Sequence, residues 1–259
     1  MTVLDFRFFA DSAERMLDAS GNLIRETGSK PFDTEIKDDG SPVTTVDEAV
    51  EDCIREIILQ AHPDHGILGE ERDDTNADAE LAWTIDPIDG TLPFLAGFPV
   101  FGTLLGLLHY GVPVLGVIDN PMTRERWIGW HNAPTTYNGT PVSTRTCTEL
   151  SQAMMSTSNP DFYSERDLPY LERMREATKL NVYGGSCMAY AQIATGRIDI
   201  GFDVAFDIHD YLPLIPVIEG AGGIVTDWRG DRLTKSSGDR FVACGDKHLH
   251  EQAMAIFSS

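Results

Sequence analysis

The stretch Trp83-Thr-Ile-Asp86-Pro87-Ile88-Asp89-Gly90-Thr91 decides how the rest of this sequence is interpreted. The apolar segment 81–85 predicts a buried strand, and two aspartates three residues apart follow it directly. Pro87 stiffens the turn between them and removes a backbone N–H donor. Carboxylates and a backbone carbonyl are hard oxygen ligands that suit Mg²⁺ or Ca²⁺ better than Zn²⁺. The stretch therefore predicts a divalent-cation site, although Asp-Pro and Asp-Gly are also common turn dipeptides.

The next two residues, Gly90 and Thr91, extend this pattern towards phosphate chemistry. Gly90 permits a close backbone approach, and Thr91 offers a hydroxyl group to a water molecule or a phosphate. Haloacid-dehalogenase-type phosphatases use a related motif, D-x-D-G-T, in which the first aspartate is the nucleophile. The spacing here, Asp86-Pro-Ile-Asp89-Gly-Thr, is one residue longer, which disfavours that alternative.

Two further groups of acidic residues could contribute to a cation site. Glu70 and Glu71 follow a predicted short strand, residues 66–69. One of them could complete the site while the other stays solvated. Asp210 stands at the predicted start of a helix, where an aspartate is also an ordinary N-cap residue. The neighbouring His209 could be a ligand or an acid–base group, but a structural histidine is the simpler interpretation.

The charge and composition limit the partners of the chain. It has 259 residues and a net charge of −21, which disfavours binding to nucleic acid or to an anionic membrane. An anionic small substrate then needs a local reversal of charge, which bound divalent cations supply. We find no apolar run of the ~20 residues that a membrane span needs, and no signal-peptide pattern. The four scattered cysteines predict no disulfide framework, so a cytoplasmic protein is expected.

Helical and extended patterns alternate in the way typical of layered α/β packing. We expect helices over the first ~30 residues, and over 45–61, with a Thr45–Glu48 capping box, 163–177, 186–194, 209–221 and 248–257. Strands are expected over 66–69, 81–85, 102–109, 112–119, 126–130, 153–156, 180–183, 198–202, 223–227 and 241–244. The turn-rich stretch 134–149 suggests two halves of one compact unit, 1–145 with the metal site and 146–259.

Together these motifs resemble the inositol monophosphatase family. The resemblance rests on Thr44-Thr-Val-Asp47, Gly69-Glu-Glu71, Asp86-Pro-Ile-Asp-Gly-Thr91 and Asp210 with Ala221-Gly-Gly223, in this order over nearly the whole chain. It implies a mixed α+β and α/β fold, a layered α-β-α-β-α sandwich of the inositol monophosphatase and fructose-1,6-bisphosphatase type, usually dimeric. It also implies Mg²⁺-dependent hydrolysis of a small phosphate monoester by metal-activated water.

The resemblance also implies a metal-ligand set. A first ion would be held by Glu70, Asp86 and the carbonyl group of Ile88, and a second by Asp86, Asp89 and Asp210. A third, weaker ion near Glu70 is common in the family, so two or three Mg²⁺ ions are expected. Mn²⁺ or Ca²⁺ can take their place in a crystal.

Catalytic and substrate-binding roles follow by the same similarity. Asp47 and Thr91 would orient and help deprotonate the attacking water, with Glu70 also in the catalytic set. The backbone N–H groups of Gly90 and Thr91 would hold the phosphate. Asp203 matches an acidic position that contacts hydroxyl or amine groups of the substrate, and Lys37 matches a lysine near the metal site.

Some segments look closest to the histidinol-phosphatase branch of the family, and they limit the range of expected substrates. One of them is Asn181-Val-Tyr-Gly-Gly-Ser-Cys-Met-Ala-Tyr190. Three positions depart from that branch. Ser186 replaces its usual aspartate, Leu92-Pro93 replaces a basic residue and a serine, and His209 replaces an aromatic residue. Histidinol phosphate and inositol monophosphate are therefore both retained as substrates.

A protein of another class also fits this fold, namely a metal-binding regulatory protein that has lost turnover. Such a protein would lack a metal aspartate, Glu70 or Thr91, and all are present. Leu92-Pro93 is the one departure in its favour. We therefore expect an active phosphatase that acts as a homodimer.

Overall fold

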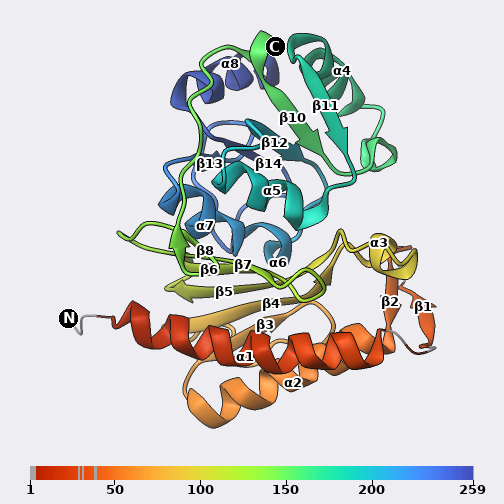
Figure 1. Cartoon of the computed structure of the whole chain (residues 1–259), viewed down its shortest axis with the longest axis vertical. Coiled ribbons are helices and arrows are strands. Elements are labelled where there is room, and N and C mark those ends of the chain that lie inside the picture. The colour runs from red at the N-terminus through yellow and green to blue at the C-terminus, as the bar shows by residue number, and fades with distance from the viewer. Residues whose placement is uncertain (1–3, 29, 31, 38–39, 259) are drawn as a thin grey trace.

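The computed structural model describes residues 4–28, 30, 32–37 and 40–258. Its elements stack in five layers, α-β-α-β-α, which confirms the predicted sandwich (Figure 1). The outer helical layers pair α1 with α2 and α4 with α8, and α5, α6 and α7 lie between the two sheets. The helices are α1 (Phe6–Thr27), α2 (Thr45–Ala61), α3 (Thr91–Leu95), α4 (Leu168–Ala177), α5 (Ser186–Ala194), α6 (Ile208–Tyr211), α7 (Leu214–Gly220) and α8 (Lys247–Phe257).

The first sheet has the order β3-β4-β5-β6-β7-β8-β9 and is antiparallel except for the parallel pair β3–β4. Its strands are β3 (Gly66–Gly69), β4 (Leu81–Asp89), β5 (Gly102–His109), β6 (Val112–Asn120), β7 (Glu125–Trp130), β8 (Thr136–Tyr137) and β9 (Thr140–Pro141). A separate hairpin, β1 (Thr34–Ile36) and β2 (Pro42–Thr44), precedes α2.

The second sheet has the order β11-β10-β12-β14-β13. Strand β10 pairs in parallel with β11 and β12, whereas β14 is antiparallel to both of its neighbours. Its strands are β10 (Met154–Thr157), β11 (Leu180–Tyr183), β12 (Ile200–Asp203), β13 (Ile224–Thr226) and β14 (Phe241–Cys244). The division of the chain at residue 145 stays a prediction.

An apolar core fills each of the spaces between these layers. One lies under α1 and α2, one surrounds the central helices, and one lies under α4 and α8. Representative buried side chains are Ile54 and Trp83 in the first core, Trp127 and Tyr190 in the second, and Phe202 and Trp228 in the third. The central core joins both sheets, so the two halves of the chain bury one continuous surface.

A row of glycines crosses the first sheet beneath the central helices. Gly106, Gly116 and Gly129 pair in register on β5, β6 and β7. A Cβ atom at Gly116 would lie 1.9 Å from the carbonyl oxygen of Pro213, and one at Gly129 would lie 2.3 Å from that of Pro216. The row therefore lets the backbone that follows α6 lie directly against the sheet. This close contact sets the distance between α6 and the sheet.

Prolines account for two differences from the predicted helices. The helix expected over 209–221 is two helices, α6 and α7, with Pro213 at the N-cap of α7. Pro216 falls in the first turn of α7, where a backbone N–H has no intrahelical partner to lose. The helix expected from 163 begins only at Leu168, with Pro169 in its first turn.

Two further boundaries differ around the acidic motifs. Strand β4 does not end at residue 85 but continues to Asp89, through a register shift between Asp86 and Asp89. The N-cap of α2 is Thr44 and its capping-box partner is Asp47, one residue before the predicted pair. Both T-x-x-D and T-x-x-E fit the capping-box pattern, and only the extended backbone of Thr44 selects the first.

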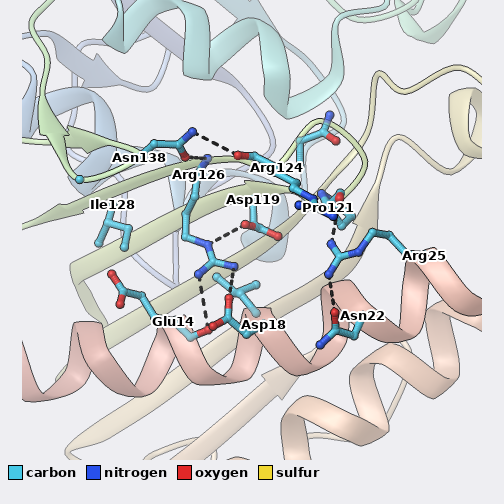
Figure 2. A pocket seen from close by; sticks show the side chains of 13 residues that line it. Glu14, Asp18, Asn22, Arg25, Asp119, Pro121, Arg124, Arg126, Ile128 and Asn138 are labelled. Carbon is cyan, nitrogen blue, oxygen red and sulfur yellow. Dashed lines mark hydrogen bonds and ion pairs between the residues drawn. The ribbon is translucent and has the colours of Figure 1, made fainter.

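A cavity of about 550 Å³ lies between α1 and the segment where β6 turns into β7 (Figure 2). Arg126 crosses it, with Nε 2.6 Å from Asp119 Oδ1 and Nη2 3.0 Å from Asp18 Oδ1. Arg25 donates to the carbonyl group of Pro121 at 2.9 Å. Because both guanidinium groups join α1 to the sheet or its connecting turn, we interpret this polar cavity as an attachment of the outer helix. None of the helices in the described part of the chain combines the length and apolar character that crossing a membrane requires.

The end of α2 provides a prediction about pH. His62 is buried among Phe8, Phe9 and Trp83, and stacks on His65 with ring centroids 4.7 Å apart. Burial, with the charges of His65 and Arg15, lowers the pKa of His62 from 6.5 to about 4. The unfolded chain therefore binds this proton more tightly, so stability present above pH 6.5 is lost as the pH falls towards 4.

We expect His62→Leu to weaken this pH dependence. Between pH 7.5 and 4.5 the wild type should lose on the order of 2 kcal/mol of unfolding free energy more than the variant does. Urea unfolding at both pH values measures the difference. His248→Leu, at an exposed position, is the control. Equal pH dependence in wild type and His62→Leu would contradict the assignment.

Candidate active site

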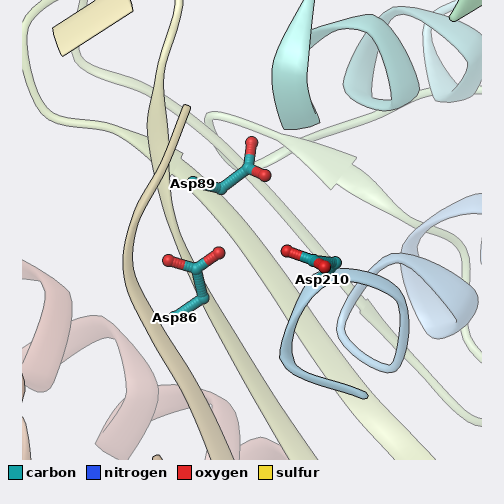
Figure 3. Close-up of side chains that lie close together, drawn as sticks. All are labelled: Asp86, Asp89 and Asp210. Atoms are coloured by element: carbon teal, nitrogen blue, oxygen red, sulfur yellow. The ribbon is translucent and has the colours of Figure 1, made fainter. Parts of the chain in front are cut away.

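Three aspartates from distant parts of the sequence come together between the first sheet and the central helices. Asp86 and Asp89 lie on β4 and Asp210 lies on α6 (Figure 3). One carboxylate oxygen from each lies within 4.8 Å of the other two. This is the spacing that a shared cation needs, and these are the aspartates that the family resemblance assigns to the second metal site.

Local geometry explains why both β4 aspartates reach this space. The register shift at Pro87 lets two residues three apart face the same side, where an unbroken strand would alternate them. Thr103 of β5 fixes the shifted segment by donating its hydroxyl to the Pro87 carbonyl at 2.9 Å. Asp210 is held at the start of α6 because its carboxylate accepts the backbone N–H of Asp207 at 2.7 Å.

The pKa values of the three clustered aspartates are raised, because the groups are buried and their negative charges repel one another. Burial, followed by the charges of Glu70, Asp89 and Asp210, raises the pKa of Asp86 well above its usual value. Burial also raises the pKa of Asp89 to about 6, against the hydrogen bonds from Cys187. For Asp210, burial and the charges of Asp89 and Glu70 raise the pKa strongly.

The donor set fits a hard divalent cation. Among the described residues, Asp86 Oδ1 is buried without a hydrogen-bond partner. An unpartnered buried carboxylate oxygen is costly unless a cation or water meets it. A cation at this point would satisfy that oxygen and offset the repulsion of the other carboxylates. The residues present therefore fit Mg²⁺.

Glu70 lies beside this cluster, and its charge raises the pKa of Asp47 as well as those of Asp86, Asp89 and Asp210. Its carboxylate meets Lys37 Nζ at 3.1 Å, and the same ammonium lies 2.7 Å from Glu71. The side chain of Glu71 is only 5% exposed, so it is not the solvated member of the pair that the sequence suggests. Lys37, predicted near the metal site, is thus in contact with both glutamates.

Asp47 combines the predicted catalytic role with a structural one. Its Oδ2 atom accepts hydrogen bonds from the backbone N–H and the hydroxyl group of Thr44 at the start of α2. Burial raises the pKa of Asp47 to about 6, although these bonds lower it. The Thr91 hydroxyl donates to the carbonyl group of Ile88 at 3.2 Å, and within the described part of the chain no hydrogen bond joins it to Asp47.

The predicted phosphate-binding turn is closely packed. Gly90 has φ +90°, and a Cβ atom there would lie 2.5 Å from the Ser186 hydroxyl oxygen. Ser186 itself has φ +47° and begins α5. The next residue, Cys187, donates its backbone N–H to Asp89. This contact was missed from the sequence because nothing in the pattern brings residue 187 to residue 89. Leu92, one of the two departures in α3, is 51% exposed.

The last two candidates differ in their surroundings. Asp203 is buried, and its oxygens accept hydrogen bonds from Thr157, Ser158 and Tyr190. A role for it in contacting the substrate stays a prediction. His209 is also buried, and neither ring nitrogen has a hydrogen-bond partner among the described residues.

The five-layer sandwich and the acidic cluster at its centre define a protein of layered α/β architecture with a candidate divalent-cation site. The chain belongs to the inositol monophosphatase family, whose model matches residues 7–259. Most of its curated relatives are named phosphatases, and the chain accordingly hydrolyses phosphate monoesters.

Individual relatives support this assignment. The chain is 44% identical to the bifunctional phosphatase IMPL2, chloroplastic, of Arabidopsis thaliana, over 95% of this chain and 74% of that protein. It is 30% identical to a histidinol-phosphatase of Chlorobaculum parvum, over 78% and 79% of the two chains. Among solved structures, an inositol monophosphatase from Zymomonas mobilis matches with a TM-score of 0.90 and 35% identity, over 99% of this chain and all of that one.

Proposed function

We propose that this phosphatase depends on Mg²⁺ and acts on histidinol phosphate or inositol monophosphate. The observation that carries the metal dependence is the unpartnered buried oxygen of Asp86 within the cluster of Asp86, Asp89 and Asp210. Glu70, Asp86 and the carbonyl group of Ile88 would hold one ion, and Asp86, Asp89 and Asp210 another. When bound, such ions lower the pKa of water and stabilise the charge that develops during phosphoryl transfer.

The chain's own residues would position the reactants. Asp47 Oδ2 is fixed by Thr44, and its other oxygen would accept a proton from the attacking water. Thr91 would orient the same water, with its own position set by the carbonyl group of Ile88. The backbone N–H groups of Gly90 and Thr91, at the left-handed turn of Gly90, would bind the phosphate oxygens.

The substrate assignment rests on chemistry and on the relatives. The acidic chain suits a cationic substrate such as histidinol phosphate, and the carboxylates also suit the hydroxyl groups of a polyol. One relative is named a histidinol-phosphatase and another a probable inositol 1-monophosphatase. A regulatory protein without turnover is not favoured, since every predicted catalytic residue is present.

Phosphate release from a substrate panel tests the proposal. The panel contains histidinol phosphate, inositol 1-phosphate, a nucleoside 3′,5′-bisphosphate and fructose 1,6-bisphosphate, each with Mg²⁺ and with chelator. We expect one of the first two to lead in kcat/KM and chelator to abolish turnover. Equal activity in chelator would refute the metal dependence, and a bisphosphate in first place would refute the substrate assignment.

Ser186 is expected to influence the choice between the two substrates. It lies against Gly90 at the start of α5, where the histidinol-phosphatase branch usually has aspartate. We expect Ser186→Asp to shift the ratio of kcat/KM values about tenfold towards histidinol phosphate, because a carboxylate there attracts the cationic end. Ser186→Asn is the uncharged control. An unchanged ratio in Ser186→Asp would count against this role.

We also propose a cytoplasmic homodimer. The edge strand β11 is exposed along its whole length and carries Leu180, Val182 and Tyr183. An exposed apolar edge strand is a common site of association. Light scattering in solution gives the mass of the particle and thereby tests the dimer.

A further inference from the structure

One face of α2 connects the proposed catalytic aspartate to the loop of a proposed metal ligand. Asp47, Glu51 and Arg55 follow at intervals of four residues and therefore lie on the same face of the helix. Glu51 is fully buried, and its Oε1 atom lies 2.6 Å from Nε of Arg55. Burying a charge costs desolvation free energy, which only an ion-pair partner and further hydrogen bonds can offset.

The Glu51–Arg55 ion pair forms hydrogen bonds with the backbone of the loop that follows β3. Glu51 Oε2 accepts the backbone N–H of Glu71 at 2.7 Å, and Arg55 Nη2 donates to the carbonyl group of Arg72 at 3.0 Å. A Cβ atom at Gly69 would lie 2.0 Å from Glu51 Oε1 and 2.4 Å from Arg55 Nη2. A side chain at position 69 would therefore have to displace the ion pair, which lies directly against the loop.

Glu70 stands between these contact points. On its other side its backbone N–H donates to the carbonyl group of Ile85, the residue before Asp86, at 3.2 Å. The loop is therefore fixed from β4 on one side and from α2 on the other. A change on the α2 side would move Glu70 relative to Asp86 without touching the three-aspartate cluster.

From these contacts we propose that Glu51 and Arg55 are positioning residues that set the location of Glu70, and through it the metal affinity of the first site. The inference rests on the proposed Mg²⁺ dependence. Residues that orient metal ligands typically change metal affinity by about 10- to 100-fold when they are altered. Glu51 and Arg55 touch neither substrate nor reacting atoms, so their effect should be on metal binding rather than on chemistry at saturating metal.

The test is calorimetric titration of the substrate-free protein with Mg²⁺. We expect Glu51→Gln to raise the Kd of one site about tenfold, and Arg55→Lys, which keeps the charge but loses the fork geometry, to raise it less. Glu56→Gln, on an exposed position of the same helix, should leave Kd unchanged. At saturating Mg²⁺, kcat should return to near the wild-type value.

The outcomes separate this inference from the proposal beneath it. If the wild type binds no Mg²⁺, the proposed metal dependence itself fails. If the wild type binds Mg²⁺ and both variants bind it equally well, the positioning role is overturned, even if their unfolding midpoints in chelator fall. Should Glu51→Gln not fold, Arg55→Lys decides by the same titration.

Discussion

Asp89→Asn is expected to reduce turnover by more than about 100-fold at saturating Mg²⁺ while the protein stays folded. Loss of a direct metal ligand should exceed the 10- to 100-fold cost typical of residues that only support one. The fold should survive because an asparagine oxygen can still accept the backbone N–H of Cys187. Steady-state phosphate release measures the first effect and thermal unfolding the second.

Although Asp89→Asn should lower turnover, it is not expected to lower the stability of the metal-free protein. Burial and the charge of Glu70 raise the pKa of Asp89, so its ionised form is disfavoured in the folded protein. In chelator Asp89→Asn should therefore unfold at the same temperature as wild type or above it. Asp64→Asn, on an exposed loop, is the control. Turnover within twofold of wild type would show that Asp89 is not a metal ligand.

Gly116→Ala is expected to destabilise the protein by about 3 kcal/mol, the upper part of the usual range for an added buried methyl group. A Cβ atom there would lie 1.9 Å from the carbonyl oxygen of Pro213, and neither the strand nor the helix backbone can turn aside as a side chain could. Urea unfolding measures the loss.

This substitution should also weaken metal binding, because Pro213 follows Asp210 by three residues. Displacing the backbone at Pro213 moves α6 and hence one carboxylate of the cluster. Gly238→Ala is the matched control, since a Cβ atom at Gly238 would meet open space. A Gly116→Ala protein with wild-type stability and Mg²⁺ affinity would show that the glycine row does not set the position of α6.

Local pattern was enough to predict most elements of the fold. The strand over 102–109 and the helix over 186–194 were predicted with the bounds that the structure has, because apolar spacing and turn residues act within a few positions of the chain. The predictions failed where proline or a register shift mattered, at α4, α6–α7 and the end of β4, and where two overlapping capping boxes competed, at the start of α2. The sequence shows that a proline is present but not whether it will fall in the first turn of a helix.

The acidic site divides in the same way. Asp86 and Asp89 could be predicted as a pair from their own segment, and the family resemblance brought Glu70, Asp47 and Asp210 to them. The residues that surround each carboxylate in the folded protein could not be predicted. Asp203 is enclosed by hydrogen bonds from its own chain, and Glu71 is buried against Lys37.

The sequence by itself thus determined which kind of cation site was expected, because it contains the oxygen donors and their order along the chain. Only the tertiary structure decided the distances between them. Asp210 meets Asp86 because a row of glycines lets α6 and α7 lie against the sheet, and the loop that carries Glu70 is held by an ion pair on α2. Such contacts join residues far apart in the chain, and packing rather than local propensity selects them.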